Sequence, residues 1–122
     1  MRYDRGMEPG LGSILAVMAG GGFGGMARAW LCTRIRGAAG VMLVNGTGSL
    51  ALGYLAARAA PDSALWLFLA TGVLGAYTTV SGFALQSLQM WQGGARFRAA
   101  ANVVGSVAVA VAAVALGLWA GL

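Results

Sequence analysis

The side chains in this sequence that could do chemistry are few and electrically neutral, and they are spaced by helical turns. Asn45 and Ser49 are four residues apart, as are Asn102 and Ser106, so each pair shares one face if its segment is helical. Further hydroxyl groups gather within residues 64–90, at Thr71, Thr78, Thr79 and Ser81. Neutral donors without carboxylates suit an anion or water better than a cation, and they equally suit hydrogen bonds between helices.

The composition excludes the common catalytic sites. The 122 residues include no His, a single Cys (Cys32) and three carboxylates, which are Asp4, Glu8 and Asp62. This inventory excludes a Ser-His-Asp or Cys-His site, a zinc site of the usual ligands and a two-carboxylate hydrolase. We therefore expect a protein that is not an enzyme.

The elements that must position these side chains are membrane spans. Charged residues make up 9% of the chain and apolar residues 59%, whereas a soluble domain has about a quarter charged residues. A span needs about 20 mostly apolar residues, and the chain supplies four, at about 11–31, 38–57, 64–90 and 99–121. We expect an all-α membrane protein with four transmembrane helices per chain, forming a single transmembrane domain over residues 1–122.

The arginines indicate how the chain sits in the bilayer. All eight basic residues are Arg, mostly at span ends, where an anchoring role is expected and no nucleic acid need be bound. Three of them fall on one side and four or five on the other. Such a weak bias lets a chain insert both ways, so we expect an antiparallel dimer, although one fixed orientation stays open.

The third span is expected to break near the middle of the membrane. Gly72, Gly75 and Gly82, together with the residues Thr78–Ser81, crowd its centre, and glycine is a poor helix former. Carbonyl groups freed at such a break are tolerated only inside protein, where they can bind a cation.

No acidic residue lies inside any of the four spans. A four-span chain of this length also suits a small multidrug-type coupled transporter, which needs a membrane-embedded carboxylate to exchange protons for cationic drugs. The absence of that carboxylate disfavours this alternative.

Three motifs, in order along the chain, carry a family resemblance. Gly20-Gly21-x-x-Gly24 with Arg28 looks like the pattern GG-x-x-G-x-x-x-R, and Val44-Asn45-x-x-Gly48-Ser49 looks like VN-x-x-GS. Gly75-x-x-Thr78-Thr79-x-Ser81-x-Phe83 looks like G-x-x-TTFSTF. Together, in a four-span chain of this length, they resemble the small bacterial fluoride channels, which export fluoride as dual-topology dimers.

The resemblance implies a role for each matching residue. The carbonyl groups of Gly75 and Thr78 would hold a structural sodium ion on the dimer axis, two from each chain. The fluoride pathway would include Asn45, Phe83, Ser81, Thr79 and Ser106. Gly24 and Arg28 would be structural. The cell inner (plasma) membrane is the expected location of this multi-pass protein.

Three departures from the family pattern concern the pore. Val80 replaces the first of the family's two Phe residues, Gln86 replaces a Glu, and Asn102 occupies a position where the family often has Tyr. The expected function is passive, fluoride-specific export by a homodimer. The alternatives are a heterodimer with a related subunit, in which this chain contributes a degenerate pore, and a non-conducting assembly subunit.

Overall fold

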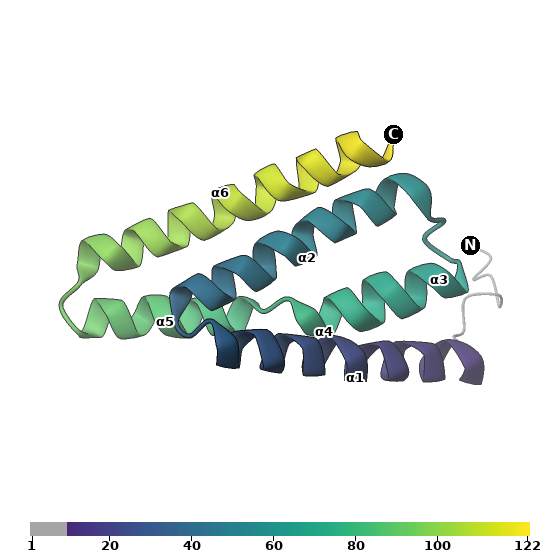
Figure 1. Ribbon diagram of the computed structural model, residues 1–122, viewed down its shortest axis with the longest axis horizontal. Helices are drawn as coiled ribbons and strands as arrows, with labels where there is room; N and C mark the ends of the chain where they lie inside the picture. The colour runs from purple at the N-terminus through teal and green to yellow at the C-terminus, as the bar shows by residue number, and fades with distance from the viewer. Residues whose placement is uncertain (1–9) are drawn as a thin grey trace, which may run out of the picture.

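The computed structural model describes residues 10–122, which form four long helical segments (Figure 1). In order they are α1 (Leu11–Arg34), α2 (Ala38–Arg58), a third segment over residues 64–92, and α6 (Arg96–Gly121). The third segment consists of α3 (Ala64–Trp66), the π-helix η2 (Leu67–Leu74), α4 (Gly75–Tyr77) and α5 (Val80–Gln92). Each of the four is long and apolar enough to cross a membrane, which confirms the predicted all-α fold with four spans.

The helix ends differ from the predicted ones by a few residues. Cys32–Arg34 were expected in a turn and are helical, and the last helix begins at Arg96 instead of residue 99. Arg is a good helix former, and its long side chain can reach polar surroundings while its backbone stays helical. The remaining turns are short and contain Gly37 and Gly94 at positive φ (79° and 87°), a conformation that favours glycine.

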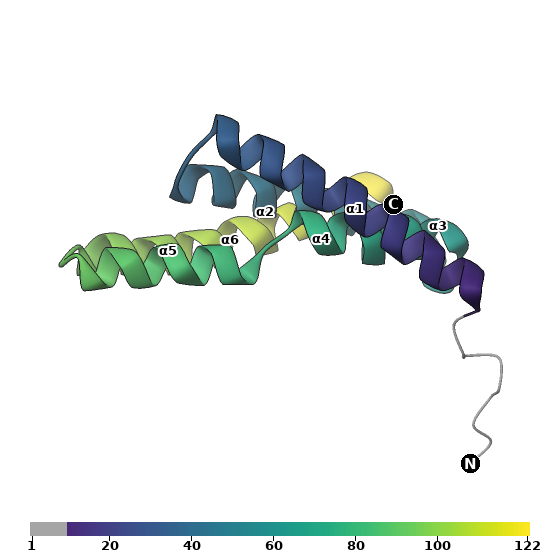
Figure 2. The ribbon, with the colours of Figure 1, turned by 90° about the horizontal axis from the view of Figure 1, so that it is seen from below.

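The third segment changes its packing partner along its length. Its first part, through η2 and α4, packs against α1, whereas α5 packs against α6. Figure 2 shows α5 running beside α6 away from α1, after an extended link that follows α4. Helix α2 packs on α6 along most of its length and completes the bundle. The interruption therefore lets one span connect two helix pairs.

Small residues set the distance between α1 and the third segment. A Cβ atom added at Gly24 would overlap the Val73 carbonyl, and one added at Gly72 would lie 2.9 Å from the Gly20 Cα. These contacts bring the two backbones together in the way that small residues spaced four apart allow in membranes. The π-helical geometry of η2, in which the Gly75 N–H bonds the Ala70 carbonyl, was not anticipated from the sequence.

Most of the apolar surface of the single chain is exposed. Only Val41, Val44, Ala70 and Ala99 are buried apolar residues among residues 10–122. Large side chains such as Phe23, Val104 and Leu116 are more than half exposed. Such a surface fits a lipid or protein environment and not water.

The Gly24 contact yields a prediction with a matched control one residue away. Gly24→Ala should lower the free energy of unfolding by about 1–3 kcal/mol, because its methyl group collides with a rigid backbone carbonyl. Gly25→Ala should cause no loss, since nothing lies within 4 Å of a Cβ at that position. Unfolding in detergent mixtures measures both, and equal losses would contradict the close packing described here.

Candidate functional site: the interrupted third span

The interruption consists of two extended residues, Thr78 and Thr79. Thr78 has φ −80° and ψ 155°, and Thr79 has φ −147° and ψ 119°. The Thr78 hydroxyl donates to the Leu74 carbonyl (2.9 Å) at the end of the preceding helix. The Thr79 hydroxyl accepts from the Gly82 N–H (3.0 Å) as the N-cap of α5. Threonine is favoured at such caps, so this pair of residues ends one helix and begins the next.

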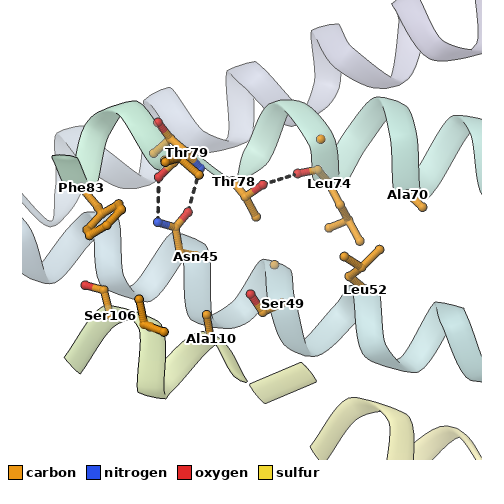
Figure 3. A pocket seen from close by; sticks show the side chains of 14 residues that line it. Asn45, Ser49, Leu52, Ala70, Leu74, Thr78, Thr79, Phe83, Ser106 and Ala110 are labelled. Carbon is orange, nitrogen blue, oxygen red and sulfur yellow. Dashed lines mark hydrogen bonds between the residues drawn. The ribbon is translucent and has the colours of Figure 1, made fainter. Parts of the chain in front are cut away.

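Side chains from two other helices satisfy the backbone of the interruption. Asn45 of α2 accepts from the Thr79 N–H (2.7 Å) and donates to the Thr79 carbonyl (2.8 Å) through the same amide (Figure 3). Arg28 of α1 donates to the Thr78 carbonyl (3.2 Å). In an apolar environment unpaired backbone groups cost several kcal/mol each, so these contacts make the extended link tolerable.

The same bonds release the two carbonyl groups expected to hold sodium. In a continuous helix the Thr79 N–H would bond the Gly75 carbonyl, but here it bonds Asn45. The Gly82 N–H would bond the Thr78 carbonyl, but here it bonds the Thr79 hydroxyl. The Gly75 oxygen is thus freed from its helical partner, and the Thr78 oxygen keeps one lone pair beside its bond to Arg28.

Opposite helix ends meet at this interruption. The carbonyl end of α4 carries partial negative charge and suits a cation, whereas the N–H end of the 13-residue α5 carries partial positive charge and suits an anion. The residues present therefore fit a sodium ion at the carbonyl groups and a halide beside α5. Carbonyl oxygens are suitable ligands for such a hard cation.

A pocket of about 330 Å³ opens beside the interruption. It lies between α2, the third segment and α6, and it brings together six of the predicted site residues: Asn45, Gly75, Thr78, Thr79, Phe83 and Ser106 (Figure 3). Its wall is otherwise mostly apolar, with Ser49 as a further hydroxyl group. Ser49 was not among the predicted site residues, although its spacing from Asn45 placed it on the same helix face.

Three predicted residues lie outside this pocket. Ser81 is exposed on the single chain, and its hydroxyl lies 3.1 Å from the Thr79 hydroxyl. Gly24 packs against Val73, and Arg28 reaches the interruption from α1. No sequence pattern indicated which atom Arg28 would contact, because its partner is a backbone carbonyl 50 residues away.

Gly75 is not needed for steric reasons within one chain. Glycine at the centre of the third span was expected to favour the break because it is a poor helix former, but Gly75 is helical (φ −61°, ψ −37°). A Cβ atom there meets only the Ala70 carbonyl, at 3.7 Å, an ordinary contact. Gly75 therefore does not itself form the break in the single chain, because the extended geometry begins three residues later, at Thr78.

The positions that depart from the family pattern have distinct surroundings. Val80 lines the pocket and is 76% exposed. Gln86 has a buried Oε1 atom that finds no hydrogen-bond partner among residues 10–122. Asn102 is buried and donates to Ser87, a contact that the sequence did not indicate.

Fold and site together define a four-span membrane protein with an interrupted third helix and, at the interruption, a mostly apolar pocket that contains a few neutral polar side chains. Residues 15–118 match the family described as CrcB-like protein, Camphor Resistance (CrcB), and the chain belongs to this family.

Curated relatives agree with this assignment. A protein of Rhodopseudomonas palustris (strain BisB18) called fluoride-specific ion channel FluC 2 is 41% identical over 88% of this chain and 91% of its own length. Fluoride-specific ion channel FluC of Methylobacterium sp. (strain 4-46) is 40% identical, over 85% of this chain and 91% of that protein. The protein of the same name from Rhodospirillum rubrum is 38% identical, over 89% and 91%.

The two hydrogen bonds between Asn45 and Thr79 yield a stability prediction. Asn45→Leu should lower the free energy of unfolding by about 1–3 kcal/mol for each Thr79 group left unpaired. Ser49→Ala is the matched control, one turn further on the same helix face, and should change stability by less than about 0.5 kcal/mol. Detergent unfolding measures both, and equal stability of the two variants would show that Asn45 does not hold the interruption.

Proposed function

We propose that this chain is a fluoride-specific ion channel that exports fluoride passively across the cell membrane and so lowers cytoplasmic fluoride. The observation that carries the proposal is the pocket with neutral polar side chains beside an interrupted third span, in a chain about 40% identical to fluoride-specific ion channels. The protein is a passive transporter and not an enzyme.

Passive export is sufficient for this task. Fluoride enters a cell as neutral HF, which dissociates inside. A negative-inside potential then favours outward movement of the anion, by about 2.3 kcal/mol per charge for each 100 mV. No acidic residue lies in the spans, so nothing there would couple transport to protons. The multidrug-type alternative therefore has no support.

The pocket offers an anion neutral donors and an aromatic ring. Asn45 has a second amide hydrogen beyond the one given to Thr79, and Thr79 and Ser106 add hydroxyl groups. The ring edge of Phe83 is electropositive. The Ser81 hydroxyl, next to that of Thr79, continues this row of hydroxyl groups outside the pocket. These groups would partly replace the water that fluoride gives up on entry.

The ring of Phe83 yields a prediction for conduction. Phe83→Ile should lower fluoride efflux from liposomes about fivefold, because roughly 1 kcal/mol of ring-edge attraction is lost while the volume is nearly kept. Phe97→Ile is the matched control, since Phe97 is 85% exposed near the start of α6 and outside the pocket. A fluoride electrode measures the efflux. Unchanged flux in Phe83→Ile would place the pathway elsewhere.

The exposed apolar surface and the near-balanced arginines support an antiparallel homodimer in the cell inner (plasma) membrane. A heterodimer with a related subunit is the alternative, and Val80 favours it because this chain supplies one Phe where the family pattern has two. A thiol reagent confined to one side of the membrane can test this with a Leu122→Cys variant in a Cys32→Ser background. It should label half of the molecules if both orientations are present, and all or none of them if there is one orientation.

A structural sodium ion at the Gly75 and Thr78 carbonyl groups would join the two chains. Two carbonyl groups from each protomer would supply four oxygen ligands. Because a Cβ at Gly75 meets only an ordinary contact within one chain, a side chain added there is expected to act mainly on the shared site.

Removal of sodium should therefore weaken the dimer. Replacing sodium by N-methylglucamine should lower dimer stability by about 3 kcal/mol if sodium is present at a hundred times its dissociation constant. In Gly75→Val the dimer should be weaker and insensitive to sodium. Size-exclusion chromatography and detergent unfolding measure both quantities. Equal stability of the unmodified dimer in the two salts would contradict the sodium site.

A further inference from the structure

Two buried polar side chains join α5 to α6 outside the pocket. Ser87 is 8% exposed and Asn102 is 7% exposed, and together with Ser106 they are the buried polar residues within residues 10–122. The Asn102 amide donates to the Ser87 hydroxyl at 2.9 Å. Neither residue lines the pocket.

The direction of each hydrogen bond is fixed by the donors available. The Ser87 hydroxyl has one hydrogen, which it donates to the Phe83 carbonyl at 2.8 Å. Its oxygen must then accept from Asn102, as the geometry requires. The two bonds therefore form a chain from α6 to the backbone of Phe83.

These two hydrogen bonds lie one helical turn away from the pocket. Phe83 and Ser87 are one turn apart on α5, and Ser106 and Asn102 are one turn apart on α6. Phe83 and Ser106 line the pocket, while Ser87 and Asn102 form the adjoining layer. The position of the Phe83 backbone relative to α6 is thus set one turn away from the ring.

We propose that Ser87 and Asn102 are positioning residues that hold Phe83 in place against α6 and thereby set how well the channel conducts. This inference rests on the proposed fluoride channel. The hydrogen-bonded chain acts on the backbone of Phe83 and not on the ion. Removing these hydrogen bonds therefore lowers fluoride flux only in a protein in which the ring of Phe83 contributes to that flux.

The test is fluoride efflux from liposomes, scored for folded protein in the unmodified and Phe83→Ile backgrounds. Ser87→Ala should lower efflux about threefold in the first background, as expected for the loss of an average hydrogen bond between membrane helices, and by less than Phe83→Ile itself. It should cause no further loss in the second. Asn102→Leu removes the same bond from the α6 side while keeping a side chain branched at Cγ, and should behave in the same way.

Thr47→Val is the matched control. Like Ser87, Thr47 donates its hydroxyl to a carbonyl one turn back, that of Leu43 (2.7 Å). The same hydroxyl lies 2.9 Å from the Tyr77 hydroxyl. Thr47 does not line the pocket at the interruption. Its efflux should equal that of the unmodified protein.

Three outcomes would overturn the assignment. The first is a flux loss in Ser87→Ala and Asn102→Leu that persists at the same ratio in the Phe83→Ile background. The second is unchanged flux in both variants, and the third is an equal loss in Thr47→Val. Absence of fluoride flux from the unmodified protein would instead overturn the proposed function, and this assignment with it.

Discussion

The structure depends on the pairing of backbone groups that the interrupted span leaves without helical partners. In an apolar environment these groups have no water to bond, so an extended link is stable only if protein atoms satisfy it. Asn45 bonds both polar groups of Thr79, Arg28 bonds the Thr78 carbonyl, and the two threonine hydroxyls cap the flanking helices. These contacts come from α1, α2 and the third segment itself, which explains why several spans must converge at one point.

The same interruption determines how the helices pack. A continuous third span could follow either α1 or α6, but the extended link lets its first part follow α1 and its second part follow α6. Small residues at Gly20, Gly24 and Gly72 then allow close backbone contact on the α1 side. On the α6 side the contact includes polar groups, through Ser87 and Asn102. The pocket lies where these two arrangements meet.

The pocket itself offers only neutral groups and helix ends, while the charged Arg28 bonds the Thr78 carbonyl from α1, outside the pocket. A carbonyl end and an N–H end lie within a few residues of each other, so cation and anion preferences occur side by side without any charged side chain in the pocket. This separation suits a channel, because an ion held only by neutral donors is not bound so tightly that it cannot leave. It also accounts for the absence of acidic residues from the spans.

Composition and apolar segment length were enough to predict the membrane class, the four spans and the kinds of catalytic site that are excluded. These follow from composition and from apolar length, which are additive along the chain and need no knowledge of contacts. Local glycine and threonine content also located the interruption to within a few residues, since caps act within one turn. Asn45, Thr79 and Phe83 could be named as site residues because they stand in motifs.

Which atoms meet could not be predicted before the helices were placed relative to one another. The bonds of Asn45 to Thr79 and of Arg28 to Thr78 join residues 34 and 50 positions apart, and such pairing depends on how whole helices are placed. The exclusion of Ser81 from the pocket, the tolerance of a Cβ at Gly75 and the contact of Ser87 with Asn102 depend on the same placement. The physical reason is that a helical pattern specifies a face, whereas the neighbour of that face is set by the packing of every other helix.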